Sequence, residues 1–253
     1  MNQSSIYKSI LSFFILTFTI YIPSAGQNVN EKNLYSTIKK YDLSMVLDPD
    51  TIIDDESIKI KRPEPLGYIG DTFQRFQIHI TTISKSQANP YEYKITGKTK
   101  VKNNICRFSG IITITAATWK NPTEDIGFSN YRFGHIISKI IIYEDKNDAG
   151  SGIIQGNLTT EVYLDDKNRF QYDALMLVAD GFSNSMFIGT WTSYKTGKTK
   201  KCNWGDFRIP ESADLDVGTG EFSPNSKYSE YGWGEYRTLL ISNKEEEKTE
   251  WWR

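Results

Sequence analysis

The chain contains 253 residues, 38% of them hydrophobic and 13% aromatic, and its formal net charge at pH 7 is −1. A chain of this length can bury a substantial core, and its aromatic content argues against intrinsic disorder. The near-zero charge provides no overall field for nucleic acid or an anionic membrane, and the sequence contains no phosphate-binding loop, dinucleotide fingerprint or nucleic-acid-binding basic stripe.

Residues 1–26 have the pattern of a signal peptide. An apolar run from Ile10 to Ile22 ends at Pro23, and Ser24 and Gly26 are small residues that suit cleavage immediately afterwards. The run is too short to span a membrane as a helix, although an uncleaved anchor or a buried helix is the alternative interpretation. We therefore expect an exported protein, periplasmic or extracellular, with no transmembrane segment in the mature chain.

Residues 27–66 are expected to form a lead-in to the main domain. Leu34, Ile38 and Tyr41 have helical spacing, which predicts one short helix. A charged segment follows, and because proline removes hydrogen-bond donors from a β-ladder, we expect a boundary there rather than a strand. The prolines of this segment are Pro49, Pro63 and Pro65.

Residues 67–236 are predicted to form one mostly β domain, because apolar and polar side chains alternate with a period of two. The predicted strands lie at Phe76–Ile80, Tyr91–Ile95, Phe108–Ile114, Ile136–Tyr143, Ile154–Leu164, Phe170–Ala179 and Met186–Tyr194. Turn signals separate several of them, including Lys102-Asn103-Asn104 and Asp165-Asp166-Lys167-Asn168.

The spacing suits an antiparallel meander of roughly eight strands. We favour closure into a small barrel over a sandwich, because closure removes exposed sheet edges. Glycines within or beside the strands fit sharp bends in a curved sheet; they are Gly97, Gly110, Gly156 and Gly189. The segment 202–236 lacks a strand or helix period, and 237–253 is a charged tail, helical or frayed.

Two long stretches, RPEPLGYIGDTFQRFQIHI at 62–80 and GTWTSYKTGKTKKCNWGDFRIP at 189–210, resemble a family of uncharacterised secreted bacterial proteins. This resemblance implies secretion and a shared domain, and it implies no particular activity. The strand count and Gly189-Thr190-Trp191 also resemble lipocalin and avidin-like barrels. Lipocalins carry their Gly-x-Trp in the first strand, whereas this one lies in a late strand, so the second resemblance concerns architecture.

An acidic, glycine-rich segment at 214–221 is a candidate calcium site. Asp214, Asp216 and Glu221 could direct oxygen atoms at one cation. The segment departs from the EF-hand pattern, which requires Asp or Asn where Gly218 stands. The alternative is an acidic turn whose side chains cap backbone amides.

Aromatic residues are concentrated in the C-terminal third of the chain, and flat rings with polar edges suit small ligands. We predict that Trp191 and Trp204 border a recognition surface. Arg75 and Arg208 could add charge-assisted hydrogen bonds to an acidic group of the ligand. The alternative is that these rings pack the mouth of the barrel.

Hydrolytic chemistry has weak support. His79 and His135 lie outside any nucleophile motif and are expected to be surface or structural residues. Glu161 and Asp173, on neighbouring predicted strands, could act as an acid–base pair if their separation allowed it. The two cysteines, Cys106 and Cys202, could form a disulfide in an oxidising compartment, or remain separate buried thiols. The Asn157-Leu158-Thr159 glycosylation pattern falls in a predicted strand, so no glycan is expected there.

The sequence therefore predicts an exported small-barrel protein that binds a small molecule or a protein, with 202–236 and the strand ends forming the recognition surface. Catalysis is not specifically predicted, and calcium is the one cofactor considered. Two alternatives stay open. One is a secreted carbohydrate-active enzyme that uses paired carboxylates, and the other is a structural or adhesive surface protein with a filled barrel.

Overall fold

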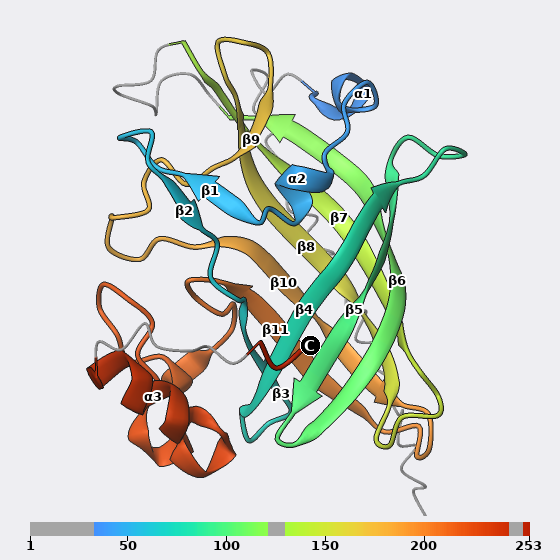
Figure 1. Cartoon of the computed structure of the whole chain (residues 1–253), viewed down its shortest axis with the longest axis vertical. Helices are drawn as coiled ribbons and strands as arrows, with labels where there is room; N and C mark the ends of the chain where they lie inside the picture. Colours follow the sequence, from blue (N-terminus) through green and yellow to red (C-terminus); the bar gives the residue numbers. More distant parts are fainter. Residues whose placement is uncertain (1–32, 121–129, 243–249) are drawn as a thin grey trace, which may run out of the picture.

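The structure is a computed structural model that describes residues 33–120, 130–242 and 250–253 (Figure 1). The predicted signal peptide lies outside the described residues. The main sheet consists of β3 (Leu66–Ile69), β4 (Gln74–Lys85), β5 (Glu92–Val101), β6 (Asn104–Trp119), β7 (Arg132–Glu144), β8 (Gly152–Leu164), β9 (Phe170–Tyr172), β10 (Asn184–Ser193) and β11 (Thr199–Asp206).

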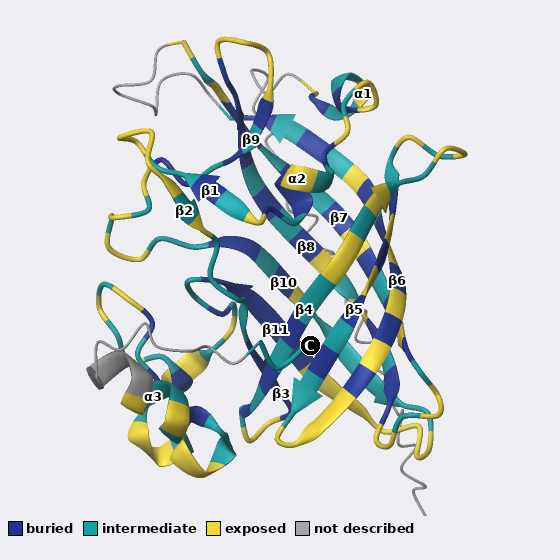
Figure 2. Cartoon of the chain, viewed as in Figure 1, coloured by how far each residue is buried: buried dark blue, intermediate teal, exposed yellow. Residues whose placement is uncertain are grey.

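The predicted antiparallel barrel is confirmed. Strands pair in the order β10-β11-β3-β4-β5-β6-β7-β8, and β10 also pairs with β8, which closes eight strands on themselves. The short β9 is an extra strand on β8. Buried and exposed residues alternate along the strands (Figure 2): Tyr93 and Ile95 of β5 are buried, whereas Lys94 and Thr96 are exposed. This period of two places one apolar face inside the barrel.

The lead-in packs against one end of the barrel. Its two helices, α1 (Tyr35–Ile38) and α2 (Ser44–Leu47), lie at the upper end in Figure 1, and α1 confirms the predicted helix. The helices and their flanks add five nearly inaccessible side chains to the core inside the barrel: Leu34, Ile38, Leu43, Val46 and Leu47. The lead-in therefore closes the upper opening and is part of the same folding unit.

The expected strand-free boundary after the helices was wrong. Residues 51–61 form a hairpin of β1 (Thr51–Ile53) and β2 (Lys59–Lys61). Pro49 precedes β1 and Pro63 follows β2, so neither proline removes a donor from the ladder.

Two other segments also differ from expectation. The strand predicted at Phe170–Ala179 ends at Tyr172, because the Asp173 carboxylate accepts a hydrogen bond from the Leu175 amide, 3.3 Å away, and starts a turn. The first residues of the segment expected to be irregular, 202–206, belong to β11. The rest contains two short 3₁₀-helices, η2 (Ala213–Leu215) and η3 (Ser226–Tyr231), and leads into α3 (Trp233–Ser242).

These C-terminal elements have a small core of their own on the outer face of β3. Its buried members are Tyr68, Ile209, Leu215, Phe222 and Trp233. The Trp233 indole also donates a hydrogen bond of 2.7 Å to the Phe73 carbonyl oxygen, which fixes the start of α3 beside the β3–β4 turn. Among the described helices, none is both long enough and apolar enough to cross a membrane.

The disulfide considered for the two cysteines is not formed. Cys106 and Cys202 are free thiols, and both are buried. Cys106 lies on β6 and Cys202 on β11, four strands apart in either direction around the eight-stranded barrel. The two thiols therefore lie on opposite walls and act as small buried side chains, which was the alternative interpretation.

Candidate ligand-binding cavity

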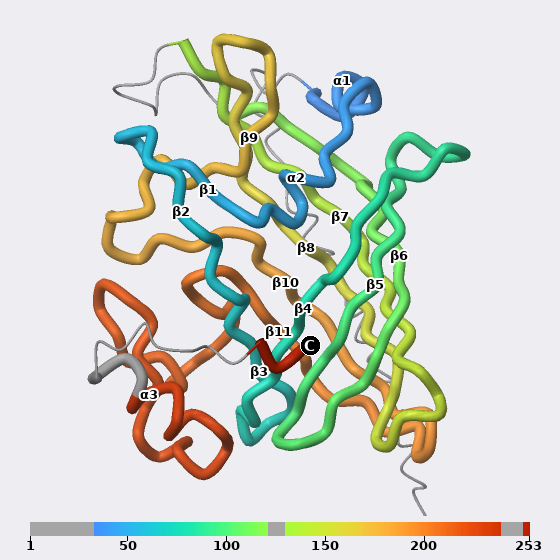
Figure 3. The backbone as a smooth tube through the Cα atoms, in the orientation of Figure 1, coloured from blue at the N-terminus to red at the C-terminus, as the bar shows by residue number. Residues whose placement is uncertain are grey.

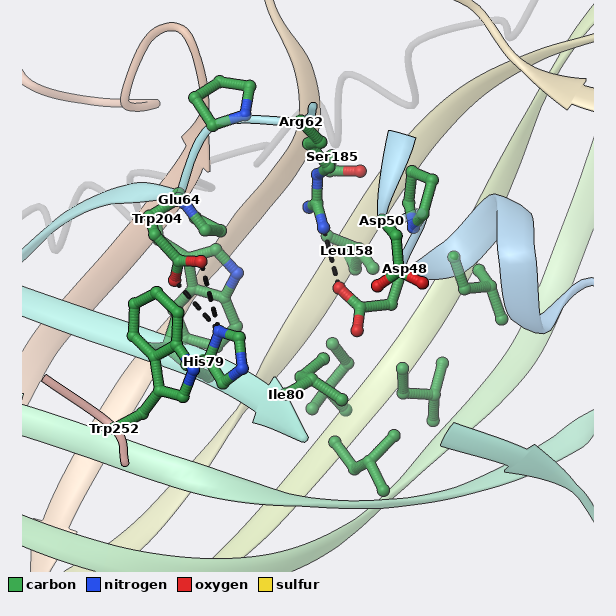
Figure 4. Close-up of a pocket in the computed structure, with 18 of the residues that line it drawn as sticks. Asp48, Asp50, Arg62, Glu64, His79, Ile80, Leu158, Ser185, Trp204 and Trp252 are labelled. Carbon is green, nitrogen blue, oxygen red and sulfur yellow. Dashed lines mark hydrogen bonds and ion pairs between the residues drawn. The ribbon is translucent and has the colours of Figure 1, made fainter. Parts of the chain in front are cut away.

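The barrel wall is interrupted beside β3. This strand pairs through residues 67–69 with β4 and through 66–69 with β11, and beyond these pairs β4 and β11 have no described strand between them. Residues 47–50 and 61–65 of the lead-in border this place, and together with the barrel strands they line a cavity of about 240 Å³. Its inner lining is largely aliphatic and comprises the buried residues Ile78, Ile95, Ile112, Ile140, Ile142 and Leu158, together with the half-buried Ile80; Figure 4 draws the cavity.

Trp204 forms an aromatic part of the cavity wall. Its ring stacks on Phe187, with centroids 3.6 Å apart and planes at 12°. Phe187 lies directly over the paired glycines Gly156 and Gly189, where an added Cβ would come within 2.7 and 2.5 Å of its ring. Glycine at both positions is therefore required for the ring to lie flat on the barrel wall and to support Trp204.

Arg62 organises the mouth of the cavity. Its Nε and Nη2 donate to the two oxygens of Asp206, at 2.8 and 3.0 Å, and its Nη1 donates to Asp48 Oδ1 at 2.7 Å. The Tyr172 hydroxyl donates to Asp206 as well, at 2.7 Å. Asp206 is fully buried, so this bidentate ion pair joins the lead-in to β11 in an environment that is largely shielded from water.

Glu64 and His79 form the other side of the mouth. His79 Nδ1 lies 3.1 and 3.2 Å from the two Glu64 carboxylate oxygens. The C-terminal Trp252 stacks on the His79 ring, with centroids 4.0 Å apart and planes at 13°. Figure 3 shows the end of the chain beside β3 and β4, where Trp252 and Glu250 complete the lining.

Burial has the largest effect on the pKa of two acidic groups of the mouth, Asp48 and Glu64. It raises the pKa of Asp48 despite the nearby Arg62 guanidinium, and it raises the pKa of Glu64 despite the contact with His79. Ser185, also in the lining, is 2% exposed, and its hydroxyl makes no hydrogen bond to the described residues. The Ser185 hydroxyl lies beside Tyr172 and acts to lower the pKa of that phenol. Burial has the larger effect, and the pKa of Tyr172 is raised.

Of the residues predicted from sequence to bind a ligand, Trp204 lines the cavity and three lie elsewhere. Trp191 is near the lower end of the barrel, where its indole donates to Glu144 at 2.9 Å. Arg208 forms a 2.6 Å ion pair with Asp216 and donates to the carbonyl oxygens of residues 218–220. Arg75 lies over the Trp233 and Tyr236 rings outside the barrel, and burial lowers its pKa.

The three carboxylates considered for calcium do not gather at one point. Asp214 bonds to Lys227 and to the Tyr228 hydroxyl. Asp216 pairs with Arg208 and caps the amides of residues 218 and 223, as the alternative interpretation proposed. Glu221 is exposed. Within the described residues, no group of three or more His, Cys, Asp or Glu side chains is arranged to hold a metal ion.

The other candidate groups for catalysis have structural partners. Glu161 forms a 2.9 Å ion pair with Lys120, and Asp173 caps the turn after β9. His135 lies 2.7 Å from the Thr118 hydroxyl on the neighbouring strand. His79 points away from the apolar face of β4, as expected, but it lies at the edge of the cavity.

Sequence reasoning missed Arg62, Asp48 and Glu64. They lie in the charged, proline-rich segment that was interpreted as a boundary. A run of charged residues beside prolines is typical of exposed linkers, and the local pattern contains nothing that distinguishes a buried charge from a solvated one. The sequence feature that could have indicated this site is Arg62 itself, because an arginine close to several acidic residues can form a buried bidentate ion pair.

A second buried carboxylate at the lower end of the barrel was also missed. Glu144 is 5% exposed, and it accepts hydrogen bonds from the Gly152 amide at 2.8 Å, from the Trp191 indole and from the Thr99 hydroxyl. These donors hold the β7–β8 hairpin against β5 and β10. Trp191 is therefore assigned a structural role.

Comparisons of the chain with protein-family models, with curated proteins and with solved structures found no match.

Proposed function

We propose that this chain is an exported barrel protein that binds a small, largely apolar ligand. The observation that supports the proposal is the aliphatic cavity of about 240 Å³ inside the barrel, with charged and hydrogen-bonding groups at its mouth. Cavities that bind small molecules are mostly apolar, with a few polar groups that orient the ligand. The volume is below the range typical of drug-sized ligands, which indicates a short chain or a single ring.

The lining favours this function over the two alternatives. Groups that could bond to sugar hydroxyls are confined to the mouth, and the isoleucine and leucine side chains farther in offer none, which favours an apolar ligand over a carbohydrate there. A purely adhesive protein would need no internal cavity, because its barrel could be filled by side chains. The paired carboxylates considered from sequence, Glu161 and Asp173, are not part of the lining.

The test is a pair of substitutions at neighbouring positions of β6. Ile112 is buried and lines the cavity, whereas Ile111 is 36% exposed and points outward. The protein would be titrated with octanol, octanoate and octylamine by isothermal calorimetry. At least one probe should bind the wild type. Ile112→Phe should weaken that binding about tenfold or more by filling the cavity, and Ile111→Phe should leave it unchanged.

Urea unfolding of both variants controls for overpacking, which commonly costs about 1–3 kcal/mol without abolishing the fold. Failure of all three probes to bind the wild type would contradict the proposed function. Equal weakening by both variants would place the ligand outside the cavity. Export is tested separately, because a secreted product should begin at Gln27 when its intact mass is measured.

A further inference from the structure

The mouth of the cavity carries more acidic than basic groups. Four carboxylates line it, and the cationic side chains of the lining are Lys61 and Arg62. The carboxylates are Asp48, Asp50, Glu64 and Glu250. Asp206, behind Arg62, adds a fifth negative charge next to the cavity. The local field therefore favours a positive group at the mouth.

Neither cation is available to an anionic ligand. Three nitrogen atoms of Arg62 already donate to Asp206 and Asp48, and Asp206 is fully buried, so withdrawing the guanidinium would leave an unpaired buried charge. The Lys61 side chain is 77% exposed, and its ammonium lies 4.0 Å from Glu250. A carboxylate or phosphate in the mouth would meet acidic groups without a free positive partner.

The acidic groups, in contrast, can accept more hydrogen bonds than the described residues donate to them. Asp48 Oδ1 accepts from Arg62, and Asp48 Oδ2 makes no hydrogen bond to the described residues. Glu64 faces one ring nitrogen of His79. Figure 4 shows these two carboxylates on either side of Arg62, above the aliphatic lining. A carboxylate accepts about four hydrogen bonds, so both can accept more from an ammonium group.

Ser185 is a further polar residue of the lining and lies beside Tyr172. The Ser185 hydroxyl is buried, lines the cavity and lacks a hydrogen-bond partner among the described residues. Buried polar groups in folded proteins are almost always satisfied by protein, water or ligand. A hydroxyl can accept a hydrogen bond from an ammonium as readily as donate one, so Ser185 is compatible with the same head group.

On the basis of the proposed function, we infer that the ligand is an amine: an aliphatic or aromatic body in the isoleucine-lined cavity, with a cationic head at the mouth, where the Asp48 oxygen not bonded to Arg62 and the Glu64 carboxylate can accept hydrogen bonds from it. The aliphatic lining binds the body through burial of apolar surface, and the two carboxylates orient the head. A cation here would relieve the repulsion among the carboxylates of the mouth and would satisfy oxygen atoms that the folded chain leaves without donors.

The experiment compares three probes that share an eight-carbon body and differ in the head. At neutral pH octylamine is cationic, octanol is neutral and octanoate is anionic. Calorimetric titration should give about tenfold tighter binding for octylamine than for octanol, and the weakest binding for octanoate. Binding of octanol or octanoate as tight as that of octylamine would overturn the inference and leave the proposed function intact. Binding of none of the three would contradict the proposed function itself.

Two variants test where the head lies. Asp48→Asn and Glu64→Gln remove one negative charge each at nearly constant volume, and each should reduce the preference for octylamine over octanol several-fold. Glu211→Gln is the control, because this exposed carboxylate pairs with Lys201 away from the cavity. Should Asp48→Asn disturb the contact with Arg62, Glu64→Gln still decides the question. An unchanged preference in Glu64→Gln, with unfolding as in the wild type, would remove Glu64 from the site.

Discussion

Arg62 and Asp206 form a two-point ion pair that joins residues 144 positions apart in the chain. Arg62 follows the β1–β2 hairpin, and Asp206 is the last residue of β11. The pair holds the lead-in across the gap in the barrel wall and thereby defines the mouth of the cavity. It also brings Asp48, which bonds to the same guanidinium, to the edge of the aliphatic lining.

The first prediction concerns this pair. Arg62→Ala should lower the free energy of unfolding by about 3–5 kcal/mol, because it leaves the buried Asp206 charge without a partner. Arg107→Ala is the matched control. Arg107 is 62% exposed and pairs with Asp145 and Asp148 at the surface, where solvent screens the charges, so its loss should lower the stability far less than the loss of Arg62. Urea unfolding measures both, and equal losses would show that the Arg62 pair does not stabilise the fold.

The second prediction concerns Trp204, which lines the cavity and is also part of the core. Trp204→Ala should cost about 3–5 kcal/mol, because it removes a ring stacked on Phe187 and leaves a void. Trp251→Ala, at the partly exposed C-terminal end, should change stability by about 0.5 kcal/mol or less. Comparable losses in the two variants, measured by urea unfolding, would contradict a core role for Trp204.

The third prediction concerns two hydroxyls inside the barrel. Ser138 and Thr160 are fully buried on adjacent strands, and neither hydroxyl has a hydrogen-bond partner among the described residues. Ser138→Ala and Thr160→Val should each raise the free energy of unfolding by about 1 kcal/mol, because an apolar group replaces an unsatisfied polar one.

The contrasting variant for these two is Thr99→Val. The Thr99 hydroxyl donates to the buried Glu144, so its removal should destabilise the protein by about 1–3 kcal/mol. If Ser138→Ala and Thr160→Val destabilised the protein as Thr99→Val does, an internal water must satisfy the two hydroxyls.

The fourth prediction is a pH dependence that originates at Glu64. Burial raises the pKa of this carboxyl in the folded state, against the opposing effects of His79 and Arg62, while Asp48 raises it further. The folded state therefore holds the proton more tightly than the unfolded state, whose Glu pKa is about 4.3. The resulting stabilisation is fully present below the unfolded pKa and is lost as pH rises through the folded one.

Glu64→Gln lacks this titration. Relative to the wild type, the variant should therefore gain stability as pH rises from about 4 to about 7, a range that begins near the unfolded pKa. Urea unfolding across this range measures the difference between the two proteins. A difference that shifts in favour of the wild type with rising pH would show that the pKa of Glu64 is lowered on folding.

The fifth prediction concerns the two thiols. Burial raises the pKa of Cys106 to about 11 and also raises that of Cys202, so both stay protonated and shielded at neutral pH. The native protein should react slowly with Ellman's reagent, and the denatured protein should release two equivalents without added reductant. An intact mass two hydrogens lighter than that of the reduced chain would instead demonstrate a disulfide.

Much of the architecture could be predicted from local pattern. Alternation along β5 and β6, and the turn at Lys102-Asn103, with Val101 opposite Asn104, were readable because side chains of a strand point alternately to opposite faces. The glycines at 156 and 189 were predicted to mark sharp bends in the sheet, and the pattern did not indicate that the two pair with each other or that the Phe187 ring lies over them. Secretion and the two family resemblances remain predictions.

The cavity depended on the tertiary structure. A strand pattern specifies which residues face inward, but Ile78 of β4, Trp204 of β11 and Leu158 of β8 line one space only because the barrel closes through the β8–β10 pairing. The arrangement of charged residues at the mouth depended on the tertiary structure even more than the cavity did. Arg62 and Asp206 are far apart in sequence, and an ion pair has no local period, so nothing near either residue indicates its partner. Their contact forms when the lead-in packs against the barrel, because burial of Leu43, Val46 and Leu47 brings the charges behind them to the gap in its wall.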